Sequence, residues 1–396
     1  MKTIRELYKI GRGPSSSHTM GPAKACKIFI SRHRADRYKV VLYGSLSLTG
    51  KGHLTDQVIK EVMKNVDIEF SSDFIDEHPN TMDLIAYKDQ KEIAHSRVYS
   101  VGGGTIRFEG ETYEETPHIY PHQRFSEIKA YCKREKIRLA DYVRRFEGVG
   151  IDDFLRMVYS TMVASIDAGL HKEGVLPGTL KVERKAHHLY TKKMKNEPPE
   201  IYENRMVSAY AFAVNETNAS GGTVVTAPTC GASGTMPAVL RYMQERHNME
   251  ESRILDALAT AGIIGNIIKH NASISGAEAG CQAEVGSACA MAASAHASLF
   301  NLTIDQIEYA AEIALEHHLG LTCDPILGYV QIPCIERNAV AALRAIDACG
   351  LAYFLSDSRK IDFDTAVETM FETGKDMPAN YRETSCGGLA KTFKFK

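Results

Sequence analysis

The sequence predicts an α+β protein of two domains, a small N-terminal α/β domain followed by a larger all-α domain. The chain has 396 residues, which is enough for two hydrophobic cores. Strand and helix patterns mix before residue 112, and from residue 125 onward helix follows helix. We therefore place the domains at 1–112 and 125–396. The linker, 113–124, contains Pro117 and Pro121 and shows no hydrophobic period.

The first domain shows the alternating elements of an α/β layer. The β-branched and aromatic run at 38–43 predicts a strand, and apolar residues at helical spacing predict a helix over 55–66. Residues 67–70 and 93–101 predict two more strands, the second closed by three glycines at 102–104. A glycine-rich loop is predicted over 44–53, directly after the first strand.

The second domain is predicted to be a helical bundle. Apolar residues recur at helical spacing through it, and the segment 285–300 is rich in Ala, Ser and Gly, which allows close helix packing. Examples of the expected helices are 126–135, 151–168, 252–269, 285–300, 304–317, 335–348 and 363–373.

The composition is ordinary for a soluble globular protein, with 44% hydrophobic and 24% charged residues and a formal net charge of −2. Because there is no basic block, the charge pattern favours neither nucleic acid nor an anionic membrane as a partner. We find no run of about 20 apolar residues and no signal peptide. We expect a cytoplasmic location, where the nine cysteines stay reduced and are free to bind metal.

A hydroxyl-rich run, GRGPSSSHT at 11–19, precedes an expected helix start near residue 21. Backbone amides and hydroxyls at a helix N-terminus can bind a carboxylate or a phosphate. A capped, solvent-exposed loop explains the run equally well, so both interpretations stand. The candidate binding residues are Ser15, Ser16, Ser17, His18 and Thr19.

Three further polar runs allow similar interpretations. The loop at 44–53 lacks the Walker spacing, so a nucleotide phosphate is not expected there, and it ends at His53, a residue type that lies more often on the surface than in a site. The run at 226–234 leads into a helix, and the run at 270–278 contains Asn271, Ser273 and Ser275. Taken singly, each is better explained as a helix cap joined to a tight turn.

Three cysteines lie in runs rich in Gly, Pro or small residues: Cys281 in SGAEAGCQAEVG, Cys323 in LGLTCDPILG and Cys334 in VQIPCIERN. Three thiolates could hold three irons of a four-iron cluster and leave the fourth open as a Lewis acid. Their spacings of 42 and 11 residues match no ferredoxin pattern, and a lone cysteine is usually a small hydrophobe. Zinc on His317, His318 and Cys323 is disfavoured because the spacing departs from that of structural zinc sites.

Five motifs together resemble a known family. GPSSSHTMGP, SGAEAGCQAEVG, EHHLGLTCDP, QIPCIERN and YRETSCGGLA are similar to runs of the bacterial iron–sulfur L-serine dehydratases (L-serine ammonia-lyases), in their single-chain form with fused β and α domains. The resemblance covers nearly the whole chain. It implies a [4Fe–4S] cluster on Cys281, Cys323 and Cys334, whose fourth iron takes the hydroxyl of serine. It also implies that His18 and His53 belong to the active site, and we favour His53 as the base.

The resemblance further implies that Asn271, Ser273 and Ser275 belong to the substrate pocket and that the reaction is β-elimination of L-serine to pyruvate and ammonia. L-Threonine and L-cysteine are alternative substrates, since a simple apolar pocket discriminates one methyl group by only about 1–3 kcal/mol. Two other classes stay open. One is a pyridoxal-phosphate dehydratase, for which Lys181 is a poorly placed candidate, and the other is a non-catalytic iron–sulfur or amino-acid sensor. A homodimer is the default expectation.

Two features depart from the family's pattern. Cys230 stands in the TAPTCGA run where family members typically carry asparagine, so it could tune the pocket or offer an extra thiol. Some single-chain members have a C-terminal cysteine that can cap the open iron, whereas this chain ends KTFKFK and its last cysteine is Cys386. Self-capping is therefore not expected.

Overall fold

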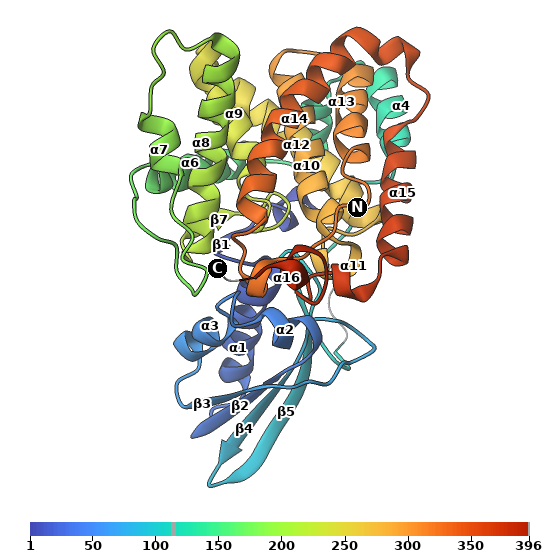
Figure 1. Ribbon diagram of the computed structural model, residues 1–396. Helices are drawn as coiled ribbons and strands as arrows, with labels where there is room; N and C mark the ends of the chain where they lie inside the picture. The colour runs from blue at the N-terminus through green and yellow to red at the C-terminus, as the bar shows by residue number, and fades with distance from the viewer. Residues whose placement is uncertain (112–115, 395–396) are drawn as a thin grey trace.

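The computed structural model describes residues 1–111 and 116–394 and has two regions that differ in kind (Figure 1). A twisted sheet with helices beside it lies at the bottom of Figure 1, and a larger bundle of helices lies above it. A small α/β region followed by a larger helical region confirms the predicted fold class. The predicted linker, 113–124, lies partly outside the described residues.

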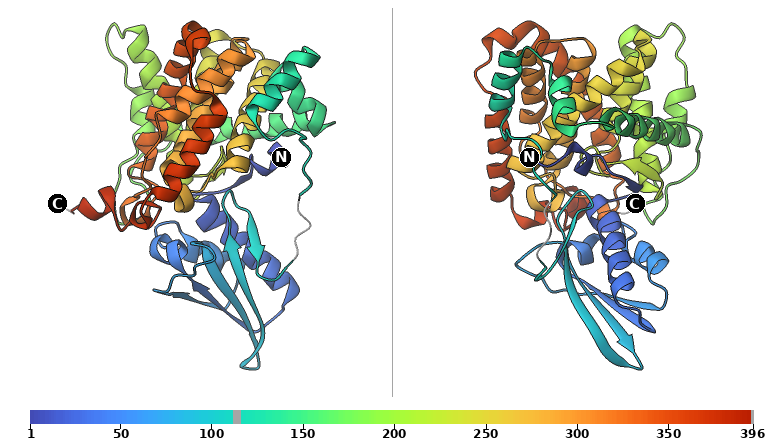
Figure 2. Two further views of the ribbon diagram at one scale, coloured as in Figure 1. Left: turned by 90° about the vertical axis from the view of Figure 1, so that its right-hand side faces the viewer. Right: turned by 180° about the vertical axis from the view of Figure 1, so that it is seen from behind.

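The α/β region is built on a five-stranded sheet in the order β3-β2-β4-β5-β6. β2 and β3 pair in parallel, and the other neighbours pair antiparallel. Helix α1 packs on the sheet (Figure 2), and Phe29, Val40 and Leu84 are fully buried between them. The bounds are β2 Arg37–Leu42, β3 Val66–Phe70, β4 Thr81–Lys88, β5 Lys91–Ser100, β6 Ile106–Phe108, α1 Gly21–Arg32, α2 Gly44–Thr49 and α3 Thr55–Val62.

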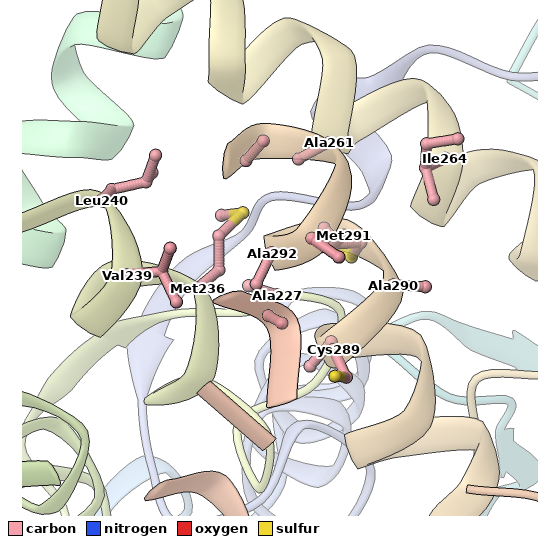
Figure 3. Close-up of a cluster of buried hydrophobic side chains, with 14 of the residues drawn as sticks. Ala227, Met236, Val239, Leu240, Ala261, Ile264, Cys289, Ala290, Met291 and Ala292 are labelled. Atoms are coloured by element: carbon pink, nitrogen blue, oxygen red, sulfur yellow. The ribbon is translucent and has the colours of Figure 1, made fainter. Parts of the chain in front are cut away.

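Helix α12 (Ser287–Leu299) is the central helix of the larger region, with α9, α10, α13 and α14 packed around it. Residues 287–297 are all buried and mostly Ala or Ser, so the neighbouring helices approach closely (Figure 3). The other bounds are α4 Phe125–Glu135, α5 Leu139–Glu147, α6 Ile151–Leu170, α7 Ala186–Thr191, α8 Pro199–Ala219, α9 Thr235–His247, α10 Glu251–Asn271, α11 Gly276–Ala279, α13 Ile304–Glu316, α14 Cys334–Leu355, α15 Phe363–Asp376 and α16 Gly388–Thr392.

The first residues of the chain belong to the helical core. Leu7 and Tyr8 are buried there, and the Tyr8 hydroxyl donates to the Leu258 carbonyl at 2.9 Å. β1 (Ile10–Arg12) then pairs antiparallel with β7 (Thr223–Val225). The chain therefore begins in the helical region and crosses into the α/β region along the hydroxyl-rich run. This path brings that run to the boundary between the two regions.

The structure differs from the sequence prediction in several elements. The prediction missed β4, which is buried along most of its length and so lacks the alternation that marks a half-buried strand. Residues 44–49 form helix α2 instead of the predicted loop. The predicted helix at 55–66 ends at Val62, because Met63 is already extended. The predicted helices of the bundle are present, although α14 continues to Leu355, beyond the predicted end at 348.

By length and composition, one helical segment among the described residues could cross a membrane, Cys334–Ser358. It contains α14, which packs against α8, α12 and α13 in the bundle.

Candidate active site

A buried cavity at the boundary of the two regions brings together residues that lie far apart in the sequence. Cys281, Cys323 and Cys334 line it from the helical region, and Ser15 and His53 line it from the α/β side. These residues meet because the chain crosses from the helical region into the α/β region, as described above. The cavity therefore joins the predicted cluster ligands to one of the two predicted catalytic histidines.

Each of the three thiols is held by a different segment of the helical region. Cys281 follows α11 and precedes a π-helical turn, Gln282–Gly286. Cys323 lies in the segment after α13, where it pairs with Arg382 in an isolated parallel β-bridge. Cys334 is the first residue of α14. π-Helical turns are rare and occur often at functional sites. The bundle thus holds Cys281 and Cys334 next to helix ends, and a β-bridge holds Cys323.

Burial raises the pKa of all three thiols, that of Cys281 to about 11. Arg337, one turn into α14, opposes this effect at Cys281 and Cys334 because its positive charge favours their thiolates. Arg337 Nη2 also donates to Asp324 Oδ1 at 3.1 Å, which fixes the guanidinium. Three thiols that line one cavity, with a fixed cation beside them, fit a cluster that has three cysteine ligands.

The imidazoles of His18 and His53 stack on each other, with their ring centroids 4.4 Å apart and their planes 23° from parallel. Both side chains are buried, with 0% and 1% of their surface exposed. Burial lowers the pKa of His18 well below its usual range and that of His53 to about 4. Both rings are therefore neutral at physiological pH.

Hydrogen bonds fix His18 as the Nε2–H tautomer. Ser45 Oγ donates its proton to the Glu383 carbonyl at 2.7 Å, so it accepts from His18 Nε2–H at 3.0 Å. His18 Nδ1 then carries the lone pair and accepts from Ser17 Oγ at 2.9 Å. Both ring nitrogens of His18 are therefore engaged with neutral hydroxyl groups.

His53 has the opposite tautomer. Its Nδ1 lies 3.0 Å from the Thr49 carbonyl, which can only accept, so Nδ1 carries the proton and Nε2 carries the lone pair. Thr19 Oγ1 donates to the His53 carbonyl at 2.8 Å and holds the backbone. Within the described residues Nε2 makes no hydrogen bond. His53 therefore offers a free lone pair at the cavity, as a general base requires.

Two glutamates, the buried Glu383 and the partly buried Glu284, complete the cavity, and the sequence analysis missed both. Glu383 Oε1 lies 3.7 Å from His18 Nδ1 and 3.5 Å from His53 Nε2. Glu284, in the π-helical turn after Cys281, accepts from Thr229 Oγ1 at 2.8 Å. Burial raises the pKa of both carboxyl groups. Both residues belong to motifs that carry the family resemblance, Glu383 to YRETSCGGLA and Glu284 to SGAEAGCQAEVG, and this was the available signal for each.

His18, His53 and Glu383 are also close enough to hold a metal ion. His18, however, would have to give up a serine hydrogen bond to become a ligand. Metal binding at this group would therefore compete with the hydrogen bonds that hold the His18 ring.

The hydroxyl-rich run forms a π-helical turn, Ser16–Met20, at the edge of the cavity. Ser15 caps this turn, since its Oγ accepts from the His18 amide at 3.1 Å, and it also lines the cavity. Ser16 is buried inside the turn, and Ser17 and Thr19 hold the two histidines as described. The run is therefore buried rather than a solvent-exposed loop.

Asn271, Ser273 and Ser275 do not line this cavity among its described residues. The Asn271 side chain donates to two backbone carbonyls at 2.8 and 3.0 Å. Ser273 Oγ donates to the Glu278 carboxylate and accepts from the Ser275 amide at 3.0 Å. Their role as substrate ligands stays a prediction.

The remaining candidates lie away from the cavity. Cys230 is buried with its Sγ 3.5 Å from Met20 Sδ, while its neighbour Gly231 lines the cavity. Cys386 is exposed. Lys181, the candidate for a Schiff base, is exposed as well.

Three thiols that share a buried cavity with a neutral histidine form a candidate enzyme active site. The chain belongs to the serine dehydratase family: the family model "Serine dehydratase alpha chain" matches residues 58–390, and "Serine dehydratase beta chain" matches residues 3–64. The chain is 40% identical to L-serine dehydratase 1 of Escherichia coli (strain K12), covering 98% of this chain and 99% of the relative. It is 40% identical to the L-serine dehydratase of Haemophilus influenzae, with the same coverage, and 38% identical to that of Helicobacter pylori (strain J99), with 99% of each chain covered.

Proposed function

We propose that the chain is an L-serine ammonia-lyase. The observation that carries the proposal is the shared cavity, in which Cys281, Cys323 and Cys334 meet the free Nε2 of His53. The names of the relatives support the same substrate. The reaction removes the α-proton and the β-hydroxyl of L-serine as water. The resulting 2-aminoacrylate tautomerises to an imine, which hydrolyses to pyruvate and ammonia.

We further propose that Cys281, Cys323 and Cys334 hold a [4Fe–4S] cluster. Their burial in one cavity, and the charge of Arg337 beside them, support this assignment. When bound, the cluster supplies a Lewis acid that stabilises the departing hydroxyl group.

His53 Nε2 is the proposed base for the α-proton. Its lone pair is directed to the cavity because Nδ1–H is bound to the Thr49 carbonyl. That carbonyl also stabilises the imidazolium that forms when the proton arrives. His18, stacked against it, stays neutral and adds no repelling charge. Positioned base catalysis of this kind contributes about 10²- to 10⁴-fold to a rate.

Ser15 and the amides of Ser16 and Ser17, at the start of the π-helical turn, are the proposed site for the substrate carboxylate. Ser15 is the hydroxyl residue of the run that lines the cavity. The turn leads directly into α1, so its amides lie at a helix start, where anions are favoured.

The proposed activity is tested by anaerobic purification, with iron and sulfide quantified and pyruvate formation followed with L-serine, L-threonine and L-cysteine. About four irons per chain and pyruvate formation from L-serine are expected. A faster reaction with L-threonine or L-cysteine would show that this amino acid is the preferred substrate of the same elimination. Rapid turnover by iron-free protein would discard the mechanism, and a full cluster without turnover on any of the three would favour a sensor.

We also propose a homodimer in the cytoplasm without nucleic-acid or membrane partners, and domains at 1–112 and 125–396. The mass in solution, measured by light scattering on a sizing column, tests the dimer. Limited proteolysis tests the division, since cleavage confined to 113–124 is expected for a true linker.

A further inference from the structure

The Glu383 carboxylate is buried in the cavity without a strong cationic partner. Among the described residues no lysine or arginine pairs with it, and its neighbours are two neutral imidazoles at 3.5 and 3.7 Å. The Ala277 backbone amide also donates a hydrogen bond to the Glu383 carboxylate. A buried carboxylate without a cation is costly, so such a group at a cavity indicates that a cation arrives with the ligand.

The backbone holds Glu383 in place from both sides. Its amide donates to the Cys323 carbonyl at 2.8 Å, and its carbonyl accepts from Ser45 Oγ at 2.7 Å. Glu383 and Ser385 both have left-handed backbone angles, with φ of 56° and 57°, which non-glycine residues rarely adopt. Strain of this kind is concentrated at functional sites. The loop is thus shaped to present this one side chain between the two histidines.

An α-amino acid brings an ammonium group that needs an acceptor next to the base, because one carbon carries both the ammonium and the proton that leaves. Glu383 and Glu284 are the two carboxylates among the described residues that line the cavity. Glu284 accepts from Thr229 and lies beside Cys323, with Oε2 3.8 Å from Sγ. Glu383 is the one that lies next to His53 Nε2.

We propose that Glu383 binds the α-ammonium group of the substrate and thereby places the α-proton at His53 Nε2. The inference rests on the proposed elimination reaction. It adds that the contact with Glu383 makes the enzyme select 2-amino acids over 2-hydroxy acids. Glu383 is on this account a substrate-binding residue that sets specificity.

The test compares wild type with Glu383→Gln, using two unreactive ligands that differ in the ammonium group, L-alanine and propanoate. Their dissociation constants are measured by NMR titration, and the KM for L-serine is measured on anaerobically loaded enzyme. Wild type is expected to bind L-alanine more tightly than propanoate, and Glu383→Gln to lose about 10- to 100-fold of that preference. The KM for L-serine rises by a similar factor, while the iron content is unchanged.

Glu312→Gln is the matched control, since it removes a buried carboxylate on α13, outside the cavity. It is expected to keep the preference for L-alanine. A Glu383→Gln enzyme that retains the preference, or a wild type that has none, overturns the proposal. Equal weakening of both ligands would instead show a general structural role. If the wild type does not turn over L-serine, the lyase assignment is wrong. The binding of the two unreactive ligands would still test the role of Glu383.

Discussion

The two regions build their sides of the cavity by different means. The helical region supplies thiols from segments that adjoin helices packed closely around α12. The α/β region supplies histidines whose rings and tautomers are set by hydrogen bonds with Ser17, Ser45 and Thr49. Substitutions on the two sides of the cavity should therefore have different effects. Damage to the thiol side should remove the cofactor, and damage to the histidine side should stop turnover with the cofactor in place.

The largest effect is expected from Cys323→Ala. Removing one of three thiols leaves too few ligands for the cluster, so both the iron content and pyruvate formation should fall to background. Iron and sulfide analysis with the visible absorbance spectrum measures the first, and a coupled pyruvate assay measures the second. A variant that keeps full iron and activity would show that this thiol is not a ligand.

His53→Gln should impair the histidine side of the cavity and leave the thiol side intact. The amide cannot accept the α-proton, so kcat is expected to fall by about 10²- to 10⁴-fold, while the iron content stays at the wild-type level. Stopped assays at high enzyme concentration measure the residual rate. If the rate survives and His18→Gln abolishes it, the base is His18, and the tautomer argument is wrong.

The histidine side also predicts how stability depends on pH. Burial lowers the pKa of His53 to about 4, below its unfolded value of about 6.5. Between these values the unfolded chain binds a proton that the native ring does not, so stability rises with pH across this window and is lost as pH falls through it. The loss from His53 alone is about 3 kcal/mol.

Thermal melts from pH 7 to pH 4 measure this dependence. His53→Gln should reduce the slope over the same window, because glutamine binds no proton, while His18, whose pKa burial also lowers, still contributes. His247→Gln is a suitable control, being a histidine on α9 outside the cavity. An unchanged slope in His53→Gln would mean that the ring is already protonated in the native protein.

Sequence patterns predicted the two sides unequally. The helical bundle follows from helical periodicity, which survives in long helices such as α6, α10 and α13. The sheet was predicted less completely, because β4 is buried on both faces and shows no alternation. A helix as short as α2 also carries too few turns to show a period.

Within the site, the cysteines were distinguishable by their Gly- and Pro-rich surroundings, and the histidines by the family resemblance. The supporting groups were not. Ser45 and Glu383 lie 338 residues apart and meet through a hydrogen bond between a side chain and a backbone carbonyl. Such a contact depends on the crossing of the chain between the regions, and no local pattern records it. The tautomers of His18 and His53 depend on these same groups.

The smallest effect is expected from Cys230→Ala, which separates a packed thiol from a ligand. Cys230 Sγ lies against Met20 Sδ at 3.5 Å, and its side chain is not among the described groups that line the cavity. The same substitution that empties the cluster site at Cys323 should here leave the iron content unchanged and alter kcat by less than about threefold. Its cost is a small cavity, about 1–2 kcal/mol of unfolding free energy. Loss of iron in Cys230→Ala would place a fourth thiol within reach of the cluster, and the assignment of the thiol side to three cysteines would then be incomplete.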